Sequence, residues 1–265
     1  MFFVIFGTKV GALELIGKAT QGGLIQGQLP SGTKLSINDV PLAITSNGIF
    51  VFGLNRNSEP KIRIEIRFRD GSIENKVLTI TKRKYKIQKI EGLARTKVTP
   101  RESDYKRIIA EHKMLQAARS KITLNTGFRR GFTWPVRGKI TGVYGSQRIL
   151  NGKPRAPHYG VDISAPKGSP VAAAADGVVG MTHLGMFFTG KTIHIDHGLG
   201  IGTVYAHLDK INVKLGSFVK KGEVIGKVGK TGRATGPHLH WGLSWKDIRL
   251  DPTSVLGKLP KRILD

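Results

Sequence analysis

Strict alternation of apolar and charged residues over positions 61–68 constrains the fold of this chain most. Lys61, Ile62, Arg63 and Ile64 begin a series in which isoleucines, and finally a phenylalanine, alternate with charged side chains. Successive side chains of a β-strand point to opposite faces of the sheet. The segment is therefore predicted to be a strand with one buried and one charged face.

Turn signals divide the neighbouring sequence into further short strands. Asn47-Gly48 precedes the apolar segment 49–52, and Asp70-Gly71 precedes the segment in which Leu78 and Ile80 resume the alternation. Such pairs are typical of tight turns between antiparallel strands. We predict a small antiparallel β-sandwich over residues 12–95.

The first 11 residues are left unassigned. The run from Phe2 to Phe6 is apolar, but it is too short for a signal-peptide core and has no basic segment before it. It is interpreted as a first strand or as the remnant of a signal that begins upstream. No export signal is therefore clearly present.

A helix start follows the sandwich. Thr99, Pro100 and Glu102 have the spacing of a capping threonine, a first-turn proline and an acidic residue near the helix N-terminus. We predict a helix over roughly residues 100–122 within a helical linker spanning 96–127. Its apolar stripe is expected to include these residues: Tyr105, Ile108, Ile109, Leu115, Ala118, Ile122 and, as a core or boundary histidine, His112.

Residues 128–265 read as a second all-β domain, rich in glycine, proline and short apolar strands. Segment 168–171 leads to Val178-Val179-Gly180 much as segment 216–219 leads to Val224-Ile225-Gly226. This echo suggests an approximate internal duplication that builds two halves of a sandwich, although repeated turn chemistry alone can mimic it.

Charge is the compositional outlier. The 265 residues include 43 Lys and Arg against 18 Asp and Glu, a formal net charge of +25. Such a surface attracts polyanions. No zinc-finger, basic-zipper or aromatic RNA-binding signature organises the charge. The runs are interpreted as a solvated face or as an attraction to an anionic envelope, and specific nucleic-acid binding is not predicted.

The absence of cysteine restricts any transition-metal site to His, Asp and Glu ligands. His158 and Asp162 are four apart in a segment whose Pro157 and Gly160 disfavour a helix, and His238 and His240 are two apart. Both spacings place side chains on one side of an extended strand. Two neighbouring strands can thus bring these groups to one ion.

Histidine and carboxylate suit zinc, and three protein ligands leave a fourth position for water, as in catalytic sites. A zinc-bound water has a lowered pKa, and hydrolysis is then the natural reaction. His207 ends the apparent strand Val204-Tyr205-Ala206-His207 and can supply a further imidazole near that water.

Together these motifs resemble the three signatures of lysostaphin-type zinc metallopeptidases. They are His158-x-x-x-Asp162, Tyr205-Ala206-His207-Leu208 and the segment from Thr231 to His240, in the family's order. The flanking segments 162–171 and 219–226 also resemble the family. The resemblance covers about residues 132–252.

The resemblance implies a duplicated-hybrid-motif β-sandwich with a substrate groove over its sheet. It implies zinc bound by His158, Asp162 and His240, with His207 and His238 as catalytic residues beside the open position. It also implies an endopeptidase that cuts peptide crosslinks between peptidoglycan stem peptides, located in the periplasm or cell envelope. The chain as a whole is then all-β, with an immunoglobulin-like accessory domain, a linking α-helix and the peptidase domain.

Other histidines and aromatic residues are given structural roles. His183 is expected in a loop, and His194 and His197 in a strand and turn. Trp241 and Trp245 are expected to pack in the core rather than line the groove.

Two rival functions remain at this stage. The same fold is reused in noncatalytic wall-binding or amidase-activating proteins that have lost metal ligands, whereas this chain retains all five polar positions; a protein regulator is also a candidate partner. Nucleic-acid binding through the net charge predicts salt-sensitive association without metal dependence. No apolar run approaches the length that spans a bilayer.

Overall fold

The alternating segment forms β6 (Lys61–Arg67), in which the isoleucines are buried and Lys61 and Arg63 are exposed. This confirms the predicted strand. It belongs to an antiparallel sheet of order β4-β3-β6-β7, which also contains β3 (Lys34–Ile37), β4 (Val40–Leu42) and β7 (Ile73–Thr79). The turns at Gly48 and Gly71 have φ of +82° and +87°, which favours glycine there.

A second antiparallel sheet in the same part of the chain has the order β1-β2-β5. Its strands are β1 (Glu14–Gly17), β2 (Leu24–Gln28) and β5 (Ile49–Gly53). Phe50 and Phe52 are fully buried, with stacked rings 6.4 Å apart. The all-β class of this part is thus confirmed, whereas its immunoglobulin-like character stays a prediction.

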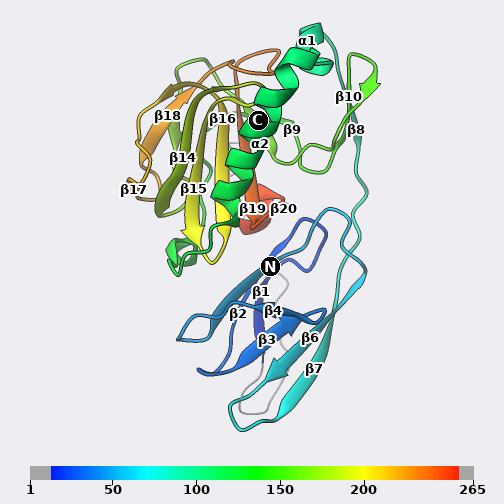
Figure 1. The fold of residues 1–265 in the computed structure, drawn as a ribbon, viewed down its shortest axis with the longest axis vertical. Coiled ribbons are helices and arrows are strands. Elements are labelled where there is room, and N and C mark those ends of the chain that lie inside the picture. Colours follow the sequence, from blue (N-terminus) through cyan, green and yellow to red (C-terminus); the bar gives the residue numbers. More distant parts are fainter. Residues whose placement is uncertain (1–12, 257–265) are drawn as a thin grey trace. The chain divides into compact units, whose positions relative to one another are not determined.

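The chain divides into two compact units, Met1–Lys84 and Tyr85–Asp265. The computed structural model describes residues 13–256 (Figure 1). The expectation for Phe2 to Phe6 therefore lies outside the described residues. Both helices belong to the second unit, as does β8 (Ile87–Ile90), which pairs in parallel with β10 (Gln147–Leu150).

The large sheet of the second unit holds the residues of interest. Among the described residues it has ten strands. Seven of them follow one another in the order β17-β14-β15-β16-β19-β12-β9. The other three lie off this path: β18 pairs with both β13 and β16, and β20 pairs with β19. The strands of this sheet are β9 (Lys139–Gly142), β12 (Val161–Ser164), β13 (Pro170–Ala172), β14 (Gly177–Met186), β15 (Gly190–Gly198), β16 (Ile201–Ile211), β17 (Phe218–Val219), β18 (Val224–Val228), β19 (His238–Trp245) and β20 (Ile248–Leu250). A short strand, β11 (Lys153–Pro154), pairs with β10, and two 3₁₀ turns, η1 (Gly127–Arg130) and η2 (Pro252–Val255), complete the unit.

The two similar segments noted in the sequence pair crosswise. β13 of the first copy pairs with β18 of the second, and β17 of the second pairs with β14 of the first. Gly168 N–H donates to Val228 O and Gly216 N–H donates to Val179 O, both at 2.8 Å. The same turn and the same hydrogen bond recur in each copy, which supports the duplication.

Trp241 and Tyr205 lie in the core of this unit with no solvent exposure, together with Ile193, Ile195 and Leu239. Trp241 thus packs in the core as expected. Trp245 is only partly buried, and its Nε1–H donates to Leu199 O at 3.2 Å.

Two details of the predicted helix are wrong. The helices are α1 (Arg95–Val98) and α2 (Glu102–Ser120), and Thr99 closes α1 instead of capping α2. The cap of α2 is Arg101, whose N–H donates to Asp104 Oδ2 at 3.3 Å. Thr99 is the C-cap of α1, where its backbone N–H donates to Arg95 O, so it does not cap the next helix.

The buried face of α2 also differs from the predicted stripe. Leu115 is buried as predicted, but Tyr105, Ile109 and His112 are exposed. Glu111 and Arg119, which were not predicted on this face, are buried. Glu111 accepts hydrogen bonds from Phe187 N–H at 2.6 Å and from Arg107 Nε at 2.7 Å. The helix meets β14 and β15, and Glu111 bonds to the connection between these two strands. The buried face of α2 therefore includes this acid beside apolar side chains.

Within residues 13–256, neither helix combines the length and apolar composition that crossing a bilayer requires.

Candidate metal centre and its flanking histidines

Strand register brings Asp162 and His240 together. Asp162 on β12 is the direct antiparallel partner of His240 on β19, and His158 lies in the turn that leads into β12. His158 is 1% exposed and Asp162 8%. Gly160 gives the His240 ring its space, because an added Cβ would lie 2.6 Å from His240 Cε1.

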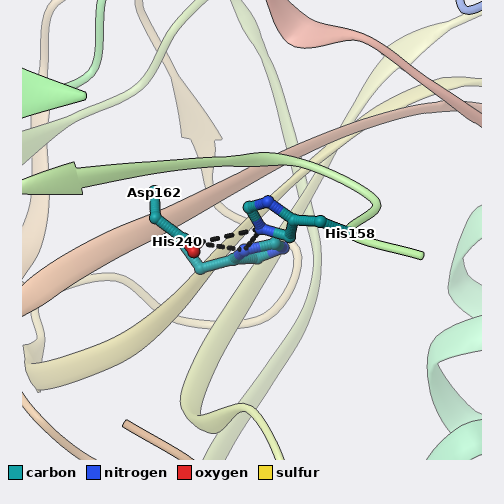
Figure 2. A group of neighbouring side chains, drawn as sticks. All are labelled: His158, Asp162 and His240. Atoms are coloured by element: carbon teal, nitrogen blue, oxygen red, sulfur yellow. Dashed lines mark hydrogen bonds and ion pairs between the residues drawn. The ribbon is translucent and has the colours of Figure 1, made fainter. Parts of the chain in front are cut away.

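Three potential ligand atoms converge in this corner (Figure 2). His158 Nε2 lies 3.0 Å from Asp162 Oδ1, His240 Nδ1 lies 2.8 Å from the same oxygen, and the two nitrogens are 3.0 Å apart. Ligand atoms of a tetrahedral zinc ion with bonds of about 2.0–2.1 Å are about 3.3 Å apart. The group therefore fits such an ion after shifts of a few tenths of an ångström.

The tautomer of His158 suits this role. Its Nδ1 lies 3.1 Å from Val143 O, and since a carbonyl oxygen only accepts, Nδ1 carries the hydrogen. The lone pair of Nε2 is then directed at Asp162 and His240. A backbone carbonyl on the non-ligating nitrogen is the usual partner of a metal-binding histidine.

Asp162 remains ionised in this buried corner. Burial by itself raises the pKa of its carboxyl, but His158 and His240 together hold that pKa well below its usual range. Its second oxygen, Oδ2, accepts a hydrogen bond from Arg148 on β10 at 2.5 Å. Arg148 thus fixes the carboxylate so that Oδ1 faces the two imidazoles.

Burial, more than any neighbouring charge, lowers the pKa of His240 to about 4. His240 is therefore neutral near pH 7, the state in which an imidazole binds a metal ion.

His207 and His238 lie beside this group. The ring centroids of His207 and His238 are 4.7 Å apart, those of His207 and His240 are 6.1 Å apart, and His238 Nε2 lies 3.9 Å from Asp162 Oδ1. The four histidines and the aspartate that the sequence predicts as site residues therefore lie together.

Backbone carbonyls orient these two rings as well. His207 Nδ1–H donates to Thr231 O at 2.7 Å, and His238 Nδ1–H donates to Gly236 O at 2.9 Å. Each ring keeps the lone pair of Nε2 free. Burial, with the neighbouring His238 and His240, lowers the pKa of His207 to about 3, so it is neutral near pH 7.

A cavity of about 270 Å³ opens over these residues. Asp162, His207 and His238 line it, with the loop 233–237 on one side and Gln88, Ile90 and Leu93 on another. A substrate in this cavity would reach the histidines directly.

The remaining histidines of this unit are placed elsewhere. The prediction of a loop at His183 is wrong, because this residue lies in β14 and pairs with Thr192 of β15. His194 and His197 are buried in β15, and His197 bonds to Asp176 O and Thr203 Oγ1 at 2.8 and 2.7 Å. Within the described residues, His158, Asp162 and His240 form the one group of three potential ligands. The structural roles expected for His194 and His197 fit these positions.

Arg148, Thr231 and Gly160 were not predicted as site residues from the sequence. Arg148 orients Asp162 by a hydrogen bond, and the Thr231 carbonyl orients His207. Gly160 leaves space for the His240 ring. Only the neighbourhood of the histidine motifs offered any signal for them.

Comparison with known proteins identifies the family. Residues 156–252 match the profile of Peptidase family M23. The crystal structure of a protein assigned to peptidase M23 from Pseudomonas aeruginosa superposes with a TM-score of 0.70 and 30% identity, covering 91% of this chain and 96% of that one. The chain belongs to peptidase family M23.

Named relatives match part of this M23 chain. The peptidoglycan DD-endopeptidase ShyA of Vibrio cholerae is 49% identical over 88 residues, 33% of this chain and 20% of ShyA. The DD-carboxypeptidase/endopeptidase Mpg of Neisseria meningitidis is 42% identical over 104 residues, 39% of this chain and 24% of Mpg. The matches thus span about a quarter or less of these two relatives.

Proposed function

We propose that this M23 chain is a zinc-dependent endopeptidase that hydrolyses peptide crosslinks of bacterial peptidoglycan. His158, Asp162 and His240 would hold the zinc ion, and His207 and His238 would assist the chemistry. The observation that carries the proposal is the convergence of three ligand atoms within 3.0 Å of one another beside two imidazoles with free Nε2 atoms.

When bound, zinc supplies a Lewis acid and a water of lowered pKa. Asp162 contributes the negative charge of the ligand set, and Arg148 keeps that carboxylate in its orientation. Val143 O does the same for His158 by holding its Nδ1–H. These contacts fix the ligands before a metal ion arrives and so lower the cost of binding it.

His207 and His238 would move the proton. A neutral imidazole accepts a proton at Nε2 from the attacking water and later delivers it to the leaving amine. A protonated imidazole stabilises the developing oxyanion. Thr231 O and Gly236 O hold Nδ1–H of the two rings, so the proton enters and leaves at Nε2.

Relatives named peptidoglycan DD-endopeptidases support the substrate class. A crosslink between D-amino acids of two stem peptides is the bond we infer. The net charge of +25 would hold the protein on the anionic envelope, and the proposed location is the periplasm or cell envelope. The N-terminal unit would act as an accessory domain that positions the peptidase or limits access to its groove.

Digestion of purified peptidoglycan by the zinc-loaded protein tests the proposal, with the chelated protein and His240→Ala as controls. Mass spectrometry of the released muropeptides should show loss of crosslinked dimers in the zinc-loaded sample alone, and the fragments identify the bond. Stoichiometric zinc without cleavage would refute the substrate class. A protein that binds no zinc would instead favour the noncatalytic wall-binding or amidase-activating function.

A further inference from the structure

An unpaired arginine lines the same cavity as the catalytic histidines. Arg148 and Arg233 both face into it, but Arg148 is bonded to Asp162. Arg233 has no carboxylate partner among residues 13–256. Its one hydrogen bond from the guanidinium goes to a backbone carbonyl, from Nη1 to Lys97 O at 3.4 Å. Most of its donors therefore stay available to a ligand.

The Arg233 side chain is held in place rather than free to move. Its guanidinium carbon lies 4.5 Å from the centroid of the Phe188 ring, and its backbone N–H donates to Phe188 O at 2.8 Å. A stacked guanidinium presents its planar fork in a fixed direction, so it loses less freedom on binding a carboxylate than a mobile lysine does.

The surroundings of Arg233 add positive charge. Burial, and next the charges of Arg148 and Arg155, lower the pKa of Arg233 to about 10. The guanidinium therefore remains charged near pH 7, but in a place that disfavours a further cation. Within residues 13–256, the Arg155 guanidinium bonds only backbone carbonyls, those of Val98 and Pro154. An anionic group in the cavity would relieve this excess charge.

The chain keeps the backbone of Arg233 close to the residue that orients His207. Thr231 O holds His207, and Arg233 is two residues further, so the Cα atoms of Thr231 and Arg233 are at most about 7.6 Å apart. An extended peptide advances about 3.4 Å per residue. Because Arg233, His207 and His238 line one cavity of about 270 Å³, a carboxylate bound by Arg233 would lie within a few residues of the peptide bond beside the histidines.

We propose that Arg233 is a specificity-determining residue that binds a carboxylate carried by the peptide substrate within a few residues of the scissile bond. The inference rests on the proposed peptidase function and adds the chemical class that the cavity selects, an anionic peptide. Ile90, Leu93 and Leu150 line the cavity as well, so an aliphatic side chain that ends in a carboxylate fits both surfaces.

Two crosslinked stem-peptide dimers, one with free carboxylates and one with those carboxylates amidated, test the proposal in the zinc-loaded full chain. Wild type should cleave the free acid with kcat/KM about 10-fold to 100-fold above that of the amide, the range of one charge-assisted hydrogen bond. Arg233→Gln should abolish this ratio by slowing cleavage of the acid and leave the amide within about threefold. Arg233→Lys should give an intermediate ratio, since it keeps the charge without the fork.

Lys230→Gln is the matched control. It removes the same charge from an exposed position three residues away, outside the cavity lining, and should leave the ratio unchanged. The proposal is overturned if Arg233→Gln keeps the wild-type ratio of kcat/KM between acid and amide. It is also overturned if this variant loses the same factor in kcat/KM on both dimers. Equal melting temperatures of the variants would exclude misfolding as the cause.

A binding measurement separates this inference from the proposed function. Calorimetric titration of the inactive His207→Ala protein with both dimers should show tighter binding of the free acid, by the same 10-fold to 100-fold. If wild type cleaves neither dimer, the proposed function fails, and the titration still decides the inference. Equal binding of acid and amide overturns it.

Discussion

Replacing His194 with leucine should flatten the acid side of the stability profile. His194 is 1% exposed on β15, and neither of its ring nitrogens has a hydrogen-bond partner within the described residues. Burial, and then the facing charges of Arg119, His197 and Arg249, lower its pKa to about 3. The unfolded chain titrates near 6.5.

The sign and size of the effect follow from these two values. Between pH 6.5 and about 3 the unfolded state binds more protons than the folded state, so stability falls as the pH falls through this window and is fully present above it. From pH 7 to pH 5 the loss attributable to His194 is about 2 kcal/mol. His194→Leu removes the titrating group and no hydrogen bond.

Urea unfolding at pH 7, 6 and 5, with zinc chelated in every sample, measures the difference. The unfolding free energy of wild type should drop by about 2 kcal/mol more than that of His194→Leu. Ile193→Val is the control, because it lowers stability by about 1 kcal/mol at every pH without removing a titrating group. Parallel profiles for wild type and His194→Leu would show that His194 is not buried in neutral form.

Four further results are expected for the proposed metal site and surface. His240→Ala should abolish zinc binding, and with it the stabilisation of about 4 kcal/mol that wild type gains in a thousandfold excess of zinc over its Kd, measured by thermal unfolding with metal analysis. Gly160→Ala should weaken zinc binding about 10-fold to 100-fold, since its Cβ would meet the His240 ring, whereas Gly185→Ala, with open space around it, should bind zinc normally in the same titration. His207→Ala should keep zinc and lose about 10²-fold to 10⁴-fold in kcat on crosslinked dimers; loss of zinc there would assign it to the ligand set. Raising NaCl from about 50 to about 500 mM should release the protein from isolated sacculi in a sedimentation assay, and salt-independent binding would contradict an electrostatic attachment.

The sequence determined the parts of the fold that depend on local pattern. The alternation of apolar and charged residues predicted β6, and the turn signals at Gly48 and Gly71 predicted where neighbouring strands end. Both signals are local, because the two-residue period of a strand and a positive φ depend on a few consecutive residues. The helix was predicted within a few residues, but only part of its buried face was, including Leu115. That face depends on Glu111 meeting the N–H of Phe187, a contact across 76 positions of the chain.

The candidate site divides in the same way. Spacing on extended strands predicted that His158 and Asp162, and His238 and His240, would point to common sides. The register that makes Asp162 and His240 direct partners joins residues 78 apart, and only the folded sheet decides it.

The sequence by itself thus determined which side chains of this protein are available for metal chemistry and in what local order. Tertiary structure alone decided how they are oriented and what surrounds them. Val143 and Thr231 contribute backbone carbonyls. Every residue has such a carbonyl, so the residue type at these positions does not predict the contact. Arg233 stacks on Phe188 and bonds Lys97, which is 136 positions away, so its environment follows from long-range packing rather than from its own neighbours in the chain.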